Sequence, residues 1–242
     1  FINGDTRFVL WFESNRQFKE VEYIQEIKGR VEKVRQMRLS STAPSTLEAA
    51  NTPYLFVQRG ERMEAFRRFE ENKKNSKQSI TQLIIPRVSS EKRRYVPMGF
   101  VDSDTVVSDS AMVVYNAPIW LLGLLESRMH MVWLSAIGGK LKTDYRYSAT
   151  LVYNTFPILN LSTQRKNEIA RVMTEILDLR EFEGGTLANL YDKDKMPDSL
   201  RKKHEELDGI VDRAYRQQKF ESDEERLSVM LQLYKEMTAN DQ

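Results

Sequence analysis

Three charged residues recur at every second position in the segment Gly138–Pro157, which reads GGKLKTDYRYSATLVYNTFP. They are Lys142, Asp144 and Arg146. Residues two apart in a β-strand project from the same face, so this spacing predicts one row of a donor, an acceptor and a donor. Such a row matches base edges in the major groove, where guanine offers two acceptors and cytosine an amino donor. We expect Lys142 and Asp144 to read one G·C pair, and Arg146 to reach an adjacent guanine or a phosphate.

The same row also has a simpler interpretation. Alternating charges solubilise an exposed strand, and ion pairs between such side chains stabilise it by only about 0–1 kcal/mol. Because spacing alone does not separate a base-reading row from a solvated one, both interpretations stay open at this point.

A second basic cluster lies in the segment SSEKRRY, which begins at Ser89. Its three consecutive basic residues follow a serine-rich turn, and another arginine lies on the strand before it. A hairpin tip with this charge suits contacts to DNA phosphates, which position a protein without reading sequence. The alternative is a solvated loop. Together with a lysine at the start of the first segment, the candidate DNA-backbone contacts are Arg87, Lys92, Arg93, Arg94 and Lys140.

Residues suited to catalysis or metal binding are scarce. The sequence has no cysteine and two histidines, His130 in an apolar segment and His204 in a charged one. A metal cluster or a catalytic triad is therefore not expected; we expect His130 to be packed in the core and His204 to lie at the surface or in a packed position. No P-loop, G-x-G-x-x-G, H-E-x-x-H or G-x-S-x-G motif occurs. Asp192 and Asp194 alternate with lysines, which indicates a solvated turn. We predict no catalytic residue and no metal site.

Hydrophobic periodicity predicts the elements of the first 80 residues. Alternating apolar residues around Asn3-Gly4 predict strands at the N-terminus. Apolar positions three and four apart predict an amphipathic helix over Phe18–Arg38. A loop rich in Ser, Thr and Pro follows over Leu39–Pro53, and a second charged helix is expected over Gly60–Lys77.

The pattern changes at Ile80. Short β-branched and aromatic runs predict antiparallel strands near 81–88, 94–101, 104–107 and 111–115. Pro118 and Gly138-Gly139 bound a long buried helix that leads into the charged row. After Pro157 only helices are expected. One is capped at Ser162 or Thr163 and runs to about Phe182, one runs from Pro197 to about Gln217, and one follows an S-x-x-E capping box at Ser222 and Glu225.

These elements predict an α+β chain with two domains. Residues 1–157 form a mixed domain with antiparallel strands and a long buried helix, and residues 158–242 form an all-α domain. The first part carries 23 Lys/Arg against 17 Asp/Glu, a formal charge of +6, and the second 14 against 18, a charge of −4. This asymmetry favours a part that faces nucleic acid joined to another part.

Location and completeness are also predicted from the composition. The lack of cysteine favours a reducing, cytoplasmic compartment. No apolar stretch reaches the ~18 residues of a membrane span, so no membrane association is expected. Because the chain starts at Phe1 without a methionine, we expect it to be a piece of a longer protein.

Two stretches of the sequence resemble a known family. LLGLLESRMHMVWLSAIGGKLKTDYRYSATLVYNTFP, followed by LANLYDKDKMPDSLRKKHEELDGIVDRAYR, is similar to the target-recognition domain and C-terminal helical region of MmeI-like (type IIL) enzymes. These enzymes fuse a DNA methyltransferase and an endonuclease in one polypeptide. The resemblance extends from about Asn3 to Tyr234. Departures at Ile158-Leu159 and Gln217 affect the helical region and not the charged row.

The resemblance implies a role for each member of the charged row. In the family, the positions of Lys142 and Asp144 take part in reading a base pair, and the arginine at the position of Arg146 lies on the same surface. The resemblance further implies a parent that methylates an adenine with S-adenosylmethionine and cuts unmodified DNA with Mg. The glycine-containing and N-P-P-[YF] motifs of such methyltransferases do not occur here, so no cofactor is expected in this chain.

The expected function is sequence-specific recognition of double-stranded DNA, without chemistry in the chain itself. Its expected partners are double-stranded DNA and the upstream methyltransferase and nuclease domains of the same polypeptide. A specificity subunit of a multi-subunit restriction–modification system is one alternative, and a helical protein-interaction scaffold is another.

Overall fold

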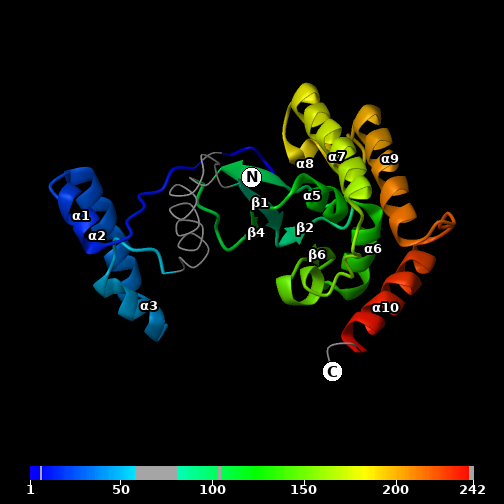
Figure 1. Ribbon diagram of the computed structural model, residues 1–242. Coiled ribbons are helices and arrows are strands. Elements are labelled where there is room, and N and C mark those ends of the chain that lie inside the picture. Colours follow the sequence, from blue (N-terminus) through cyan, green and yellow to red (C-terminus); the bar gives the residue numbers. More distant parts are fainter. Residues whose placement is uncertain (6, 58–80, 103–104, 240–242) are drawn as a thin grey trace. The chain divides into compact units, whose positions relative to one another are not determined.

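The computed structural model describes residues 1–5, 7–57, 81–102 and 105–239 (Figure 1). They fall into two units, one of Thr6–Met63 and one of Phe1–Asp5 with Glu64–Gln242. The helix expected over Gly60–Lys77 lies outside the described residues.

The unit Thr6–Met63 is helical. It contains α1 (Asn15–Val21), α2 (Gln25–Leu39), α3 (Pro44–Glu48) and the 3-10 turn η1 (Ala49–Asn51). The single helix predicted over Phe18–Arg38 is thus divided in two, and the predicted loop after it contains α3 and η1. The guanidinium of Arg38 donates hydrogen bonds to the carbonyl oxygens of Ala49, Thr52 and Leu55, at 2.8, 3.1 and 2.8 Å. These bonds fold the segment after α2 back onto the helix, a contact that no local pattern announces.

The strands predicted at the N-terminus are wrong. Phe1–Gly4 form a turn, closed by a hydrogen bond of 3.1 Å from the Gly4 N–H to the Phe1 carbonyl oxygen. A strand needs a neighbour that offers a ladder of hydrogen bonds. The Ile2 carbonyl accepts one bond of 2.9 Å from the Ala188 N–H, and no strand forms among the described residues before Thr81.

Two antiparallel sheets of three strands lie in the larger unit. In the first, β1 (Thr81–Pro86) lies between β3 (Gly99–Asp102) and β4 (Ala111–Tyr115). In the second, β6 (Asp144–Arg146) lies between β2 (Val88–Ser89) and β5 (Gly139–Leu141). The chain passes from one sheet to the other at Arg87, whose N–H donates to Ser110 and whose carbonyl accepts from Tyr147.

The predicted strands agree with this topology in part. The strands expected at 81–88 and 111–115 are confirmed as β1 with β2 and as β4. The strand expected over 94–101 is shorter, because Tyr95–Met98 are buried outside the ladder and only Gly99 onward pairs with β1. Of the strand expected over 104–107, the described residues 105–107 form none.

Two helices, α5 (Ile119–Leu125) and α6 (Arg128–Ile137), replace the single buried helix that the sequence predicted. The break lies at Glu126-Ser127, because Ser127 has extended backbone and its side chain accepts a hydrogen bond from the His130 N–H. Gly123 lets α5 approach α7 (Thr163–Glu183) closely, since a Cβ there would lie 2.6 Å from Ile169 Cγ2.

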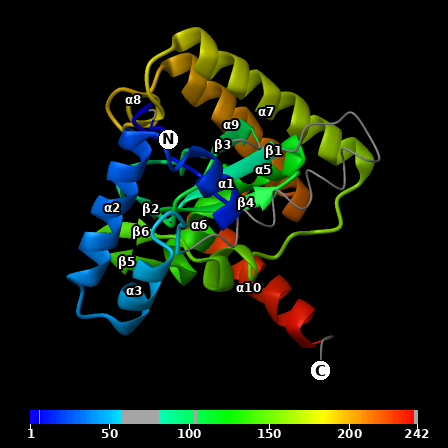
Figure 2. The ribbon, with the colours of Figure 1, turned by 90° about the vertical axis from the view of Figure 1, so that its left-hand side faces the viewer.

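The C-terminal region consists of α7 (Thr163–Glu183), α8 (Leu187–Leu190), α9 (Asp198–Tyr215) and α10 (Asp223–Ala239). The predicted starts are confirmed: Ser162 caps α7, Pro197 precedes α9, and Ser222 accepts a hydrogen bond from the Glu225 N–H. Figure 1 and Figure 2 show α7 and α9 side by side, and α5 packs on α7. One hydrophobic core therefore continues across residues 157 and 158, and the predicted domain boundary there stays a prediction.

A buried polar cluster connects the segment before β3, the break between α5 and α6, and the C-terminal helices. Glu126 accepts a hydrogen bond of 2.6 Å from the Met98 N–H and forms an ion pair with Arg180 of α7. Arg180 also donates to the Met98 carbonyl (2.8 Å) and, through Nε, to the Tyr191 hydroxyl (2.7 Å). His204 Nε2 lies 2.7 Å from that hydroxyl, so His204 is packed rather than at the surface.

Candidate nucleic-acid interface

The segment of the charged row is a β-hairpin, which corrects the single strand predicted for it. Leu141 of β5 pairs with Asp144 of β6, so Lys142 and Thr143 form a two-residue turn. Lys142 has a φ of 58° and Thr143 does not have a positive φ, as in a type II′ turn. Asp144 and Arg146 share one face of β6, but Lys142 lies at the tip of the hairpin and not in their row.

The turn escaped prediction for a physical reason. Left-handed backbone costs a residue with a side chain roughly 1–2 kcal/mol, so two-residue turns usually carry glycine or asparagine. Lys142-Thr143 has neither. The short π-helix η2 (Ala149–Tyr153) follows the hairpin. Between them, the buried Tyr147 hydroxyl lies 2.7 Å from His130 Nε2. His130 therefore lies in the core, as predicted, and burial lowers its pKa to about 3.

The predicted base-reading side chains differ in exposure. Lys142 and Arg146 are exposed and Asp144 is half-buried. The Asp144 carboxylate accepts a hydrogen bond of 3.3 Å from the Glu91 N–H, which ties the hairpin to the loop 90–94. On the other face of β6, the ammonium of Lys140 lies 3.6 Å from the centre of the Tyr145 ring.

The predicted backbone contacts divide into two groups. Arg87 forms an ion pair with Asp109 (3.1 Å), and Arg94 forms one with Glu205 of α9 (3.0 Å). The side chains of Lys92 and Arg93 have no ion-pair partner in the part of the chain that the structure describes. Their loop is closed by a hydrogen bond of 3.1 Å from the Arg93 N–H to the Ser90 carbonyl.

Asp208 of α9 fixes the end of this loop and was missed by the sequence analysis. Its carboxylate accepts a hydrogen bond from the buried Tyr95 hydroxyl (2.7 Å) and one from the Arg128 N–H (2.6 Å). Burial raises the pKa of Asp208 to about 6, against the opposing effect of these hydrogen bonds and of Arg94. The sequence offered one indication of this role. Asp208 lies on the buried side of α9 with Leu207 and Val211, and a buried carboxylate needs hydrogen-bond partners.

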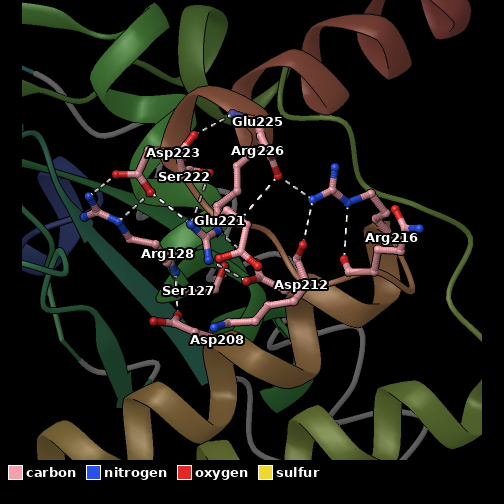
Figure 3. Close-up of polar contacts among 12 residues, drawn as sticks. Ser127, Arg128, Asp208, Asp212, Arg216, Glu221, Ser222, Asp223, Glu225 and Arg226 are labelled. Atoms are coloured by element: carbon pink, nitrogen blue, oxygen red, sulfur yellow. Dashed lines mark hydrogen bonds and ion pairs between the residues drawn. The ribbon is translucent and has the colours of Figure 1, made fainter.

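A network of ion pairs continues from Asp208 to the start of α10 (Figure 3). Arg128 pairs with Asp223, the first residue of α10. Arg226 binds both carboxylate oxygens of Asp212, at 2.6 and 3.1 Å, and also contacts Asp223 at 3.1 Å. These contacts join α6, α9 and α10.

Two further observations concern metal ions and membranes. Within the described ranges, no group of three or more His, Asp or Glu side chains is arranged to hold a metal ion. No helix among the same residues is long and apolar enough to cross a membrane. What the exposed hairpin and loop offer is hydrogen bonding and positive charge.

Two family models match consecutive parts of this chain. Residues 1–160 match the family described as "MmeI, target recognition domain", and residues 161–240 match "MmeI, C-terminal domain". "DNA methyltransferase A" of Bacillus subtilis (strain 168) is 49% identical over 238 residues, which are 98% of this chain and 25% of that protein.

A solved structure is similar over nearly the full length. It is the type IIL restriction–modification enzyme MmeI in complex with DNA, with a TM-score of 0.85 and 33% identity over 99% of this chain and 30% of that chain. The chain therefore spans between a quarter and a third of the length of these relatives.

Proposed function

The chain belongs to the MmeI target-recognition family and continues into the MmeI C-terminal domain, and from this we propose that it recognises a short sequence in double-stranded DNA for a type II restriction–modification enzyme. The observation that carries the proposal is the match of both family domains, in order, over residues 1–240. The similar structure with DNA supports it.

The β5–β6 hairpin is the proposed reading element. A two-stranded β-ribbon fits the major groove, where base edges differ between all four base pairs. Lys142 at the tip donates to a guanine, Asp144 accepts from the amino group of the paired cytosine, and Arg146 binds a neighbouring guanine or phosphate. The hydrogen bond from Glu91 leaves the second oxygen of Asp144 for this contact.

The backbone of Lys142 supports a role for its side chain. A residue held at φ 58° in an exposed turn costs stability that glycine would not cost. Strained positions of this kind cluster at functional sites. We infer that the ammonium at the tip is retained for binding.

The five basic residues predicted from sequence are the proposed phosphate contacts. Lys92, Arg93 and Lys140 lie on exposed or half-buried loop and edge positions. Arg87 and Arg94 contribute less to the binding free energy in this proposal, because Asp109 and Glu205 already compensate their charges. Contacts of this class position a protein on DNA and make its affinity depend on salt.

Methylation and cleavage belong, in this proposal, to the rest of a longer polypeptide. The chain lacks the cofactor motifs of an adenine methyltransferase, so S-adenosylmethionine and Mg act outside it. By fixing the target site, the module lets a methyltransferase domain flip out the correct adenine. A cytoplasmic location, expected from the lack of cysteine, stays a prediction.

Selection from a pool of random duplex DNA tests the proposal. The purified chain should enrich one short sequence. Lys142→Gly, which keeps the turn, and Asp144→Asn should each lose discrimination at one base pair, by about 1–3 kcal/mol. Arg171→Gln on α7 is the matched control for a lost positive charge, since Arg171 is paired with Glu175 and Glu206.

Two results would refute the assignment. If Lys142→Gly and Asp144→Asn weaken all sequences alike, or leave the enriched sequence unchanged, the hairpin does not read bases. If the chain retains no DNA at low salt, the interpretation as a protein-interaction scaffold gains support instead.

A further inference from the structure

An open hollow borders the β5–β6 hairpin and the loop 90–94, called the basic loop below. Its volume is about 810 Å³, within the range of ligand sites, but its lining is charged rather than apolar. Five of the nine lining residues are basic, three are acidic, and the ninth is the Tyr145 ring. The lining consists of Glu91, Lys92, Arg93, Arg94, Arg128, Tyr145, Lys193, Asp194 and Asp223.

The cations of this hollow are not equivalent. Arg94 and Arg128 are held by Glu205 and Asp223. The side chains of Lys92, Arg93 and Lys193 have no ion-pair partner among the described residues. Two of these three come from the basic loop, and the third comes from the C-terminal region, about one hundred residues later in the sequence.

Lys193 is held in a defined turn and not on a free tail. The Asp194 N–H donates to the Asp192 carboxylate at 3.0 Å, and the N–H groups of Lys195 and Met196 donate to the Asp192 carbonyl at 3.2 and 3.0 Å. The turn starts beside Tyr191, which is buried in the cluster with Arg180. Sequence spacing predicted only a solvated turn here, because the hollow forms from segments that are remote along the chain.

The hollow is continuous with the proposed reading element. Tyr145 belongs to β6 and projects from the face opposite Asp144 and Arg146, whereas Glu91 of the lining donates its N–H to the Asp144 carboxylate. A β-ribbon in the major groove has sugar–phosphate backbone on both sides of it, and the Glu91–Asp144 hydrogen bond holds the hollow beside the ribbon. Tetrahedral phosphates accept hydrogen bonds from lysine and arginine at such a surface.

We propose that this hollow binds backbone phosphate of the recognised DNA, with Lys193 of the C-terminal region acting together with Lys92 and Arg93. The inference rests on the proposed function, and it gives the C-terminal region a direct share in DNA binding. Glu91 and Asp194 oppose the anion, which limits the affinity of the hollow for free phosphate and favours DNA that the hairpin holds in place.

The test compares two lysines of the same turn. Affinity for one duplex is measured at several salt concentrations for the wild-type chain, Lys193→Gln, Arg93→Gln and Lys195→Gln. Lys195 is exposed and does not line the hollow. Lys193→Gln and Arg93→Gln should each flatten the slope of log affinity against log salt by about 0.9. Lys195→Gln should leave the slope unchanged.

The outcomes separate this inference from the proposed function. If the wild-type chain binds no duplex, both the proposed function and the phosphate site are refuted. If the wild type binds but Lys193→Gln keeps its slope, or if Lys193→Gln and Lys195→Gln flatten it equally, the hollow holds no phosphate while the reading hairpin stands. Circular dichroism of each variant confirms an unchanged fold before affinities are compared.

Discussion

At the scale of single residues, the buried carboxylate of Asp208 anchors the end of the basic loop. Asp208 is buried, and its carboxylate accepts hydrogen bonds from the Tyr95 hydroxyl and the Arg128 N–H. Burial destabilises its ionised form, and for that reason its pKa is raised from 3.8 to about 6. The loop 90–94 is therefore anchored by a group that is costly to ionise.

Replacing Asp208 by asparagine should change how stability depends on pH. In the folded chain Asp208 holds its proton up to about pH 6, so the stability that protonation gives is complete below 3.8 and lost as the pH rises through 6. The unfolding free energy of the wild type relative to Asp208→Asn should fall by about 2 kcal/mol between roughly pH 4.5 and pH 8. Urea unfolding at both pH values measures it, and a constant difference would contradict the raised pKa.

At the scale of elements, the distance between neighbouring helices decides whether a glycine can be replaced by a larger residue. On α5, a Cβ at Gly123 would meet Ile169 Cγ2 at 2.6 Å and Met173 Cβ at 3.3 Å. On α9, a Cβ at Gly209 meets only the end of the Arg213 side chain, at 3.4 Å. The first glycine is required by packing against α7, whereas the second leaves room.

Alanine at the two glycines should have opposite effects. Gly123→Ala overpacks the α5–α7 contact and should lower the unfolding free energy by about 1–3 kcal/mol. Gly209→Ala in the interior of α9 should raise it by about 0.5–1 kcal/mol, because alanine restricts the unfolded chain and favours helix. Denaturant midpoints of both variants decide this; equal shifts in the same direction would mean that α5 and α7 are less closely packed than described.

At the scale of the whole molecule, the buried ion pair of Glu126 with Arg180 joins the break between α5 and α6 to α7 of the C-terminal region. Burial raises the pKa of Glu126, and the charge of Arg180 and the Met98 N–H oppose that shift. Arg180 in turn binds the Met98 carbonyl and Tyr191. Removal of one partner would leave a buried charge without compensation.

Arg180→Met should therefore lower the unfolding free energy by about 3–5 kcal/mol. The double variant Glu126→Met with Arg180→Met should lose less than the single one, since no uncompensated charge remains. Arg171→Met on the same helix, whose pairs are exposed, should cost at most about 1 kcal/mol. Chemical denaturation compares the three, and a double variant less stable than Arg180→Met would contradict the role given to the pair.

Local signals account for the parts of the fold that were predicted. The caps at Ser162 and Ser222 and the β-branched runs of β1 and β4 act within a few residues of themselves, so the sequence marks them directly. The break between α5 and α6 and the turn at Lys142-Thr143 carry no such local signal. Glu126 ends α5 where its carboxylate reaches Arg180, 54 residues away along the chain, and Lys142 turns without the glycine that such a turn prefers.

The amino-acid sequence by itself determined the α+β class, the helical C-terminal region and the candidate DNA-binding residues, because composition, periodicity and motif order are properties of the linear chain. Only the tertiary structure decided that Lys142 lies at a hairpin tip, that Arg87 and Arg94 are paired, and that Lys193 joins Lys92 and Arg93 around one hollow. Those facts depend on distances between segments remote in sequence, which are fixed when the common core of α5, α6, α7 and α9 packs.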